Sequence, residues 1–367
     1  LGCTEPISVA FAAAKARDIL GGMPDSVTIK SSGPLIKNIR CVNVPGTDGL
    51  TGIEASAIAG LVGGDAQRGL EVLKSLKSED IPQINELLKQ NIVKVELLES
   101  DLNLHFIMKM TKGKESVEIE IRNLHTFVWQ IKKNGEVIFQ AHDDSDKYCG
   151  VLTDRNILSV DRILDFANNA DIKQLIKILS PQVEYNMLIA REGLTGKYGI
   201  AIGNGILRYN NSVFGKMKAY AAAASEARMC GCELPVITNS GSGNQGIAAS
   251  VPLIVYAREK GIDEIRMYRA LALANLMTIY QKTSIGRLSA FCGAVSASCG
   301  AGTGLVYLFG GNSDQIKMAI INSLADVSGI VCDGAKASCA SKIASSLDAA
   351  ITGAFLAMEN RSYLPYT

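Results

Sequence analysis

The sequence lacks the long apolar runs and the excess of one charge that mark membrane proteins and nucleic-acid-binding proteins. No apolar run reaches about 18 residues, the length at which a transmembrane helix becomes the expected structure. The 37 basic and 36 acidic residues leave a formal net charge of +1. Nucleic acids and anionic membranes attract clustered basic side chains. We therefore expect no nucleic acid and no membrane among the partners of this chain.

We also expect no secretory leader, and the nine cysteines show neither zinc-finger nor ferredoxin spacing. Without such a leader, we expect a cytoplasmic protein whose thiols stay reduced. The chain starts at Leu1, without Met and inside a helix-like pattern, so we expect that the natural N-terminus is missing. Aromatic residues make up only 6% of the chain, whereas glycine alone numbers 35. Helices rich in small residues can pack closely, which is compatible with a homodimer.

Hydrophobic periodicity divides the chain into two parts. Residues 5–20 are typical of a helix that ends at Gly21-Gly22. Strand patterns follow, with helical patterns between them, and from about 158 onward the chain is helical apart from Leu234–Thr238. The predicted strands are 27–32, 42–45, 93–98, 104–112, 115–122 and 126–140, the last with a hairpin turn at Asn134-Gly135.

We predict an α+β fold with a mainly α-helical catalytic domain and a smaller mixed α/β domain inserted near the N-terminus. The helical domain would comprise residues 1–23 and 158–367, and the α+β domain residues 24–157. In this interpretation the first helix packs with the helical half of the chain.

The cysteines are the first candidates for chemistry. Cys3 precedes a helix, and Cys332 precedes Asp333-Gly334, which resembles a helix start. A thiolate at a helix N-terminus has a lowered pKa. Cys292 and Cys299 are seven residues apart, which is about 10 Å on a straight helix, so both should not bind one compact cluster. The alternative is that each cysteine is a small buried apolar residue.

A glycine-rich stretch, residues 239–246, is the second candidate. It opens an apolar helix and satisfies a dinucleotide-binding pattern, but a Rossmann site needs a second parallel strand that this sequence does not provide. Backbone N–H groups at a helix N-terminus favour an anion, so we predict a binding loop for an α-carboxylate. A purely structural turn is the alternative. The predicted substrate-binding residues are Asn239, Ser240, Gly241, Ser242, Gly243, Asn244 and Gln245.

Three further residues are candidate catalytic groups. Lys282 can act as a general base only if burial or a nearby cation lowers its pKa. Arg287, five residues before Cys292, is placed to meet a substrate or a cluster. His125 follows a charged strand. Each has an ordinary alternative, because Lys and Arg are usually solvated and a lone His is more often structural.

The order of four motifs resembles a known family. Gly2-Cys3-Thr4-Glu5-Pro6, the stretch 239–246, Arg287 to Cys292, and Cys332-Asp333-Gly334-Ala335 with Cys339 are similar to the L-cysteine desulfidase family, which is related to the iron–sulfur L-serine dehydratase alpha chain. The resemblance implies an oxygen-sensitive 4Fe-4S cluster held by Cys3, Cys292 and Cys332, with Cys339 a reserve ligand or a neighbouring thiol. It also implies that L-cysteine and water give pyruvate, ammonia and sulfide.

Other functions remain open at this stage. The sequence does not choose between L-cysteine and L-serine as the small-molecule substrate, so L-serine dehydratase activity with the same cluster is one alternative. A pyridoxal-phosphate lyase that uses Lys282 or Lys342 is another. The third is a non-enzymatic amino-acid-binding sensor that keeps the fold without the cluster.

Overall fold

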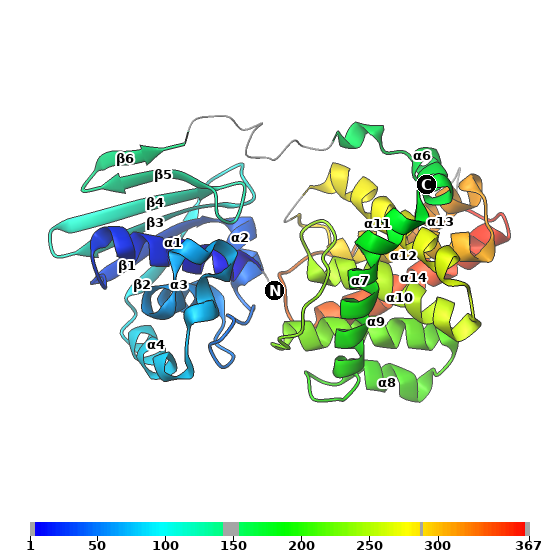
Figure 1. Ribbon diagram of the computed structural model, residues 1–367, viewed down its shortest axis with the longest axis horizontal. Helices are drawn as coiled ribbons and strands as arrows, with labels where there is room; N and C mark the ends of the chain where they lie inside the picture. Colours follow the sequence, from blue (N-terminus) through cyan, green and yellow to red (C-terminus); the bar gives the residue numbers. More distant parts are fainter. Residues whose placement is uncertain (1–3, 142–153, 287–288, 364–367) are drawn as a thin grey trace. The chain divides into compact units, whose positions relative to one another are not determined.

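The computed structural model describes residues 4–141, 154–286 and 289–363, which form two compact units (Figure 1). One unit contains residues 4–141 together with the short segment Asp333–Ala335. The other contains the described residues from Asp154 to Cys332 and from Lys336 onward. None of the helices within the described ranges combines the length and apolar character needed to cross a bilayer.

The first unit is built on one six-stranded sheet with the order β2-β1-β3-β4-β5-β6. Strands β1 and β2 are parallel, and all other neighbours are antiparallel. The β5–β6 connection has positive φ at Asn134 (52°) and Gly135 (86°), as a two-residue hairpin turn requires, so the predicted hairpin is confirmed. The strands are β1 (Ser26–Ser32), β2 (Val93–Leu98), β3 (His105–Lys112), β4 (Glu115–Arg122), β5 (Val128–Lys133) and β6 (Glu136–Gln140).

Helices pack on one face of this sheet. Alternate side chains such as Met108, Ile119 and Ile131 pair across β3, β4 and β5 and are buried. Helix α1 packs against α3 and against strands β3 and β4. The other helices of the unit are short. The bounds are α1 (Thr4–Leu20), α2 (Gly33–Ile39), α3 (Gly52–Gly63) and α4 (Ile81–Lys89), with 3-10 segments at Ala66–Ser75 and Ser78–Asp80.

The position of α1 corrects the predicted domain division. We assigned residues 1–23 to the helical domain, but α1 lies in the α+β unit. Twelve of its seventeen residues are buried, so the helix is apolar on nearly every side. Such a helix gives no directional pattern that identifies its partner. Its contact with α3 is close, because a Cβ at Gly60 would lie 2.2 Å from the Ala10 carbonyl oxygen.

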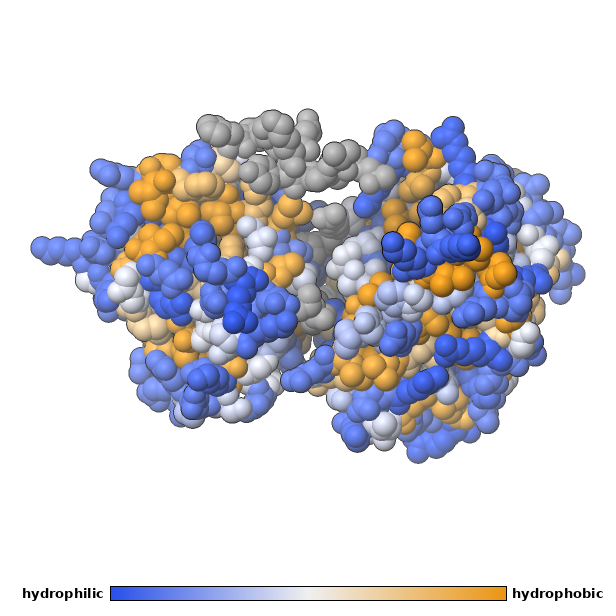
Figure 2. Space-filling view, viewed as in Figure 1, coloured by the Kyte–Doolittle hydropathy of each residue, from blue (hydrophilic) through white to orange (hydrophobic). Residues whose placement is uncertain are grey.

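Strand β6 differs from the other strands because all five of its residues are exposed. Apolar side chains gather over the β5–β6 edge in Figure 2, and Val137, Ile138 and Phe139 are 47–54% exposed. The sheet therefore ends in an apolar edge strand.

The second unit is helical, and α10 is its central element (Figure 1). Every residue of α10 from Gly243 to Ala257 is buried, and the helix packs against α7, α9, α11, α12 and α14. The bounds are α6 (Val160–Asn169), α7 (Ile172–Gly193), α8 (Ile202–Tyr209), α9 (Val213–Met229), α10 (Gly243–Lys260), α11 (Glu264–Ile285), α12 (Gly293–Phe309), α13 (Ser313–Val327) and α14 (Cys339–Met358). The prediction of a mainly helical α+β fold is confirmed.

Some predicted elements were wrong. Residues 42–45 form no strand, since Asn43 pairs with Thr51 only in an isolated bridge. The chain was predicted to be helical through Cys292, but α12 begins only at Gly293, which leaves Cys292 as the residue that precedes this helix. The helix start predicted at Asp333-Gly334 is also wrong. Gly334 instead has φ +101°, and a Cβ there would lie 2.3 Å from the Lys37 carbonyl oxygen.

Candidate functional site

The stretch 239–246 forms a tight turn that leads into α10. The backbones of Asn239 and Ser242 exchange two hydrogen bonds of 3.1 and 2.9 Å. Ser240 and Gly241 between them both have positive φ, 49° and 79°, the pattern of a type I′ turn. Ser242 is the N-cap of α10, and its hydroxyl accepts a hydrogen bond from the Gln245 backbone N–H. The turn hydrogen bonds and the Ser242 cap therefore hold residues 239–242 in a defined position at the N-terminus of α10.

Hydrogen bonds with the side chains of Asn186 and Asn275 stabilise this loop and the residues before it. The Asn186 side-chain oxygen accepts from the Ile237 N–H at 2.9 Å. The Asn239 amide donates to the side-chain oxygen of Asn275 at 2.8 Å, and the Ser240 hydroxyl donates to Asn239. The side chains of Asn239 and Ser240, which we predicted to bind substrate, thus make hydrogen bonds inside the protein.

Arg228 on α9 lies against the first turn of α10. A Cβ at Gly243 would be 2.4 Å from Arg228 Nε, so only glycine leaves room for the guanidinium. Arg228 is 9% exposed and donates from Nη1 to the Asn244 side-chain oxygen at 3.1 Å. Sequence reasoning missed this residue. The available signal was a charged side chain directly after the alanine-rich segment 221–227 of a buried helix.

Two cysteines are brought together by a short backbone pairing. Phe291 and Val331 form an antiparallel bridge, flanked by hydrogen bonds from Cys292 N to Ile330 O (3.1 Å) and from Cys332 N to Ala290 O (2.6 Å). In this register Cys292 and Cys332 are diagonal neighbours on the same side of the pairing. Phe291 and Val331 point the other way and are each 60% exposed.

Cys339, the first residue of α14, joins these two thiols. Burial raises the pKa of Cys292 and of Cys339, and the negative charge of Cys332 raises both further. The positive charge of Lys342 lowers both pKa values, and Arg228 also lowers that of Cys339. Lys342 donates to the Val331 carbonyl at 3.0 Å. We call Cys292, Cys332 and Cys339 the thiol cluster.

Cys299, the cysteine within α12, does not belong to the thiol cluster. Cys299 is fully buried, and desolvation raises the pKa of its thiol to about 12. Its Sγ lies 3.9 Å from the Ile320 carbonyl oxygen. Within the described ranges, no group of three or more His, Cys, Asp or Glu side chains is arranged to hold a metal ion. The ligands of a four-iron cluster sit on separate iron atoms, so their sulfurs need not meet at one point.

The other predicted residues are placed as follows. Cys3 and Arg287 lie outside the described residues. Lys282, in the last turn of α11, is 6% exposed and so is buried, as a lysine base would need to be. His125 belongs to the α+β unit, where its Nε2 lies 3.0 Å from the Thr4 hydroxyl, and Ser8 donates to its backbone oxygen. His125 thus holds the β4–β5 loop against the start of α1.

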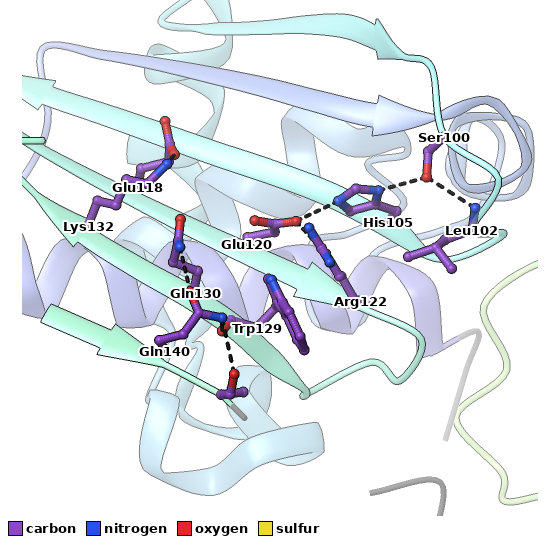
Figure 3. A network of polar contacts seen from close by, with 11 residues as sticks. Ser100, Leu102, His105, Glu118, Glu120, Arg122, Trp129, Gln130, Lys132 and Gln140 are labelled. Carbon is purple, nitrogen blue, oxygen red and sulfur yellow. Dashed lines mark hydrogen bonds and ion pairs between the residues drawn. The ribbon is translucent and has the colours of Figure 1, made fainter. Parts of the chain in front are cut away.

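The α+β unit also contains a buried polar network (Figure 3). His105 Nδ1 lies 2.7 Å from the Ser100 hydroxyl oxygen, and His105 Nε2 lies 2.8 Å from Glu120 Oε1. Arg122 donates to the same Glu120 oxygen and stacks over the Trp129 ring, 4.5 Å from its centroid. Burial raises the pKa of Glu120, but the hydrogen bonds from His105 and Arg122 outweigh it, so the pKa is lowered overall.

Comparison with known proteins assigns the chain to a family. Residues 67–365 match the model of the serine dehydratase alpha chain. The UPF0597 protein of Lachnoclostridium phytofermentans is 49% identical over 99% of this chain and 87% of its own length. The UPF0597 proteins of Treponema denticola and Shewanella oneidensis are 46% and 39% identical, each over 99% of this chain and 86% of their own length. The chain therefore belongs to the serine dehydratase alpha chain family, which supports an amino-acid dehydratase or related lyase activity.

Proposed function

We propose that the chain is an iron–sulfur-dependent lyase that eliminates the β-substituent of a small L-amino acid, with L-cysteine as its substrate. Water and L-cysteine would give pyruvate, ammonia and sulfide. The observation that carries the proposal is the thiol cluster beside the glycine-rich loop of α10. Arg228 links the two, because it bonds Asn244 of the loop and its charge acts on Cys339.

The donor chemistry of the thiol cluster fits an iron–sulfur group. Cysteine thiolates are the usual ligands of such clusters. Cys292, Cys332 and Cys339 form no disulfide, and the positive charge of Lys342 favours the ionised forms of Cys292 and Cys339, as that of Arg228 does for Cys339. On these grounds we propose Cys339 as the third ligand from this unit, in place of the reserve role that we gave it. Cys3 stays a proposed ligand from the resemblance alone.

The chain itself would bind, orient and deprotonate the substrate. When bound, the cluster supplies a Lewis-acidic iron that favours departure of the thiol or hydroxyl group. The N-terminus of α10, with the Gly243 and Asn244 backbone and the nearby Arg228, favours a carboxylate. Lys282 remains the proposed base for the α-proton, with Arg287 and His125 as the other candidates.

An anaerobic assay tests the proposal. The chain purified without oxygen should release sulfide and pyruvate in equal amounts from L-cysteine, and air should abolish this activity. Cys292→Ala should lower kcat/KM by more than about 100-fold, because even residues that only support metal ligands contribute about 10–100-fold. Cys299→Ala is the matched control, since it removes a buried thiol from α12, the helix that follows Cys292, and leaves the thiol cluster unchanged.

Iron-free protein after anaerobic purification, or full activity in Cys292→Ala, would contradict the proposal. A visible absorption band that borohydride removes would indicate pyridoxal phosphate on a lysine. Tight cysteine binding without turnover would indicate a sensor.

L-serine is a second candidate substrate, because the family model that matches the chain is that of a serine dehydratase. The same residues would then eliminate water, and the products would be pyruvate and ammonia. Comparing kcat/KM for L-cysteine and L-serine on one preparation separates the two, and a larger value for L-serine would replace our first choice.

A further inference from the structure

The side chain of Gln245 lies beside the thiol cluster, between the N-termini of α10 and α12. Gln245 lies in the first turn of α10, where its N–H is capped by the Ser242 hydroxyl. Its carboxamide lies on Gly293, the first residue of α12, because a Cβ at that position would be 2.5 Å from Gln245 Nε2. Gly293 follows Cys292 directly. The glycine at this position therefore makes room for an amide next to a cluster cysteine.

The oxygen of this amide is buried without a hydrogen-bond partner. Gln245 is 8% exposed, and no described residue donates to its Oε1. Buried acceptors are nearly always hydrogen-bonded in folded proteins, since leaving one unsatisfied is unfavourable. A ligand that brings a donor would satisfy it.

Other side chains of the loop are already engaged within the protein. Asn239 bonds Asn275, and the Asn244 oxygen accepts from Arg228. Among the described residues of the loop, Gln245 is therefore the one whose buried acceptor has no donor.

We propose that Gln245 Oε1 accepts a hydrogen bond from the α-ammonium group of the bound amino acid, and so selects amino acids over their deaminated analogues. The inference rests on the proposed function for the nature of the ligand. A neutral amide suits this position because a carboxylate there would repel both the thiolates and the carboxylate of the substrate. Gln245 is thus a specificity residue, while the N-terminus of α10 receives the carboxylate.

The test compares L-alanine with propionate, which differ only in the amino group and cannot undergo elimination. Isothermal titration of the full chain, purified anaerobically, gives the ratio of the propionate Kd to the L-alanine Kd. We expect a ratio of at least tenfold in the wild type and a ratio near one in Gln245→Met, which keeps the length of the side chain but removes the acceptor. Gln245→Glu keeps two acceptors and should hold or increase the ratio.

Gln281→Met is the matched control. The Gln281 oxygen is also buried without a partner among the described residues, but its amide donates to the Ser296 carbonyl, three residues farther along α12 than Gly293. Its substitution should leave the ratio unchanged. A ratio near one in the wild type, or an unchanged ratio in Gln245→Met, would overturn the proposal.

If Gln245→Met does not fold, a ratio of the propionate Kd to the L-alanine Kd near one in Gln245→Glu would overturn the proposal equally. Titration needs no turnover, so the two proposals can fail separately. A preserved ratio in a chain that eliminates nothing would contradict the lyase function and leave the role of Gln245 standing.

Discussion

The two units bury ionisable groups in opposite ways. In the sheet unit, Glu120 is buried but receives hydrogen bonds from His105 and Arg122, and these lower its pKa despite desolvation. In the helical unit, desolvation dominates, and the pKa values of Cys292 and Cys339 are raised. Hydrogen bonds to a charged form and burial act in opposite directions. The sheet unit thus satisfies its buried charge internally, whereas in the helical unit burial outweighs the groups that favour the ionised thiols.

The units also differ in how their cores are filled. The sheet unit buries large alternating side chains such as Phe106, Met108 and Ile119. The helical unit brings helix backbones together at small residues, and a Cβ at Gly193 would lie 2.2 Å from the Ala223 carbonyl oxygen. Close backbone contact cannot adjust as a flexible side chain can, so the helical unit should tolerate added volume poorly.

The largest effect is therefore expected from Gly193→Ala. The added methyl group would push α7 away from α9, and we expect a loss of about 3 kcal/mol in the free energy of unfolding. Urea denaturation followed by far-UV circular dichroism measures it. Gly205→Ala is the control, because that glycine is helical with nothing within 4 Å of the added Cβ. It should be neutral or stabilising by about 0.5 kcal/mol. Equal effects of the two substitutions would contradict this account of the packing.

An intermediate effect is expected from Glu120→Gln. Loss of the charge leaves His105 and Arg122 facing a neutral group, and we expect about 2 kcal/mol of destabilisation at pH 7. Trp129, the single tryptophan of the chain, lies in this network and reports unfolding of the sheet unit by fluorescence. Glu118→Gln is the control, since Glu118 lies on the same strand with an ion pair to Lys132 that is about one-third exposed. It should cost less than about 0.5 kcal/mol.

The effect of Glu120→Gln should also depend on pH. The folded-state pKa of Glu120 is below its ordinary value of 4.5. The stabilisation is therefore complete above pH 4.5 and is lost as the pH falls through the lowered folded-state pKa. The difference between wild type and variant should close in that acidic range. A difference that stays constant from pH 7 to pH 3 would show that the carboxylate charge is not its source.

The smallest effect is expected on strand β6. Ile138 is 54% exposed, so Ile138→Thr should change the free energy of unfolding by less than about 0.5 kcal/mol. Ile131, on the facing strand of the same hairpin, is 6% exposed, and Ile131→Thr should cost more than about 2 kcal/mol. Both are measured by Trp129 fluorescence in urea. A large effect at Ile138 would mean that the β6 edge is covered in solution.

Local patterns predicted much of the fold. The alternation of Val117, Ile119 and Ile121 predicted β4, and Asn134-Gly135 predicted the β5–β6 turn, because both depend on neighbouring residues. The assignment of α1 failed because its partner is chosen by packing over long sequence distances. The start of α12 was not predicted correctly, because the backbone N–H of Cys292 donates to the Ile330 carbonyl, a contact that no local pattern reveals.

The candidate site was predicted unevenly for the same reason. The cysteines and the glycine-rich loop stood out by residue type, but the sequence analysis did not identify Ser242 as the N-cap of α10. The role of Arg228 depends on three-dimensional proximity, and the sequence did not indicate it. Cys339 was grouped with Cys332 by the family resemblance alone, and its spacing carried no such information.

Iron and acid-labile sulfide analysis of the anaerobic protein tests the central claim most directly. The account predicts about four iron and four sulfide per chain in the wild type and in Cys299→Ala. It predicts less than half of that content in Cys332→Ala and in Cys339→Ala. Full occupancy in both of these variants, with each still folded by circular dichroism, would contradict the assignment of the thiol cluster as the cofactor site.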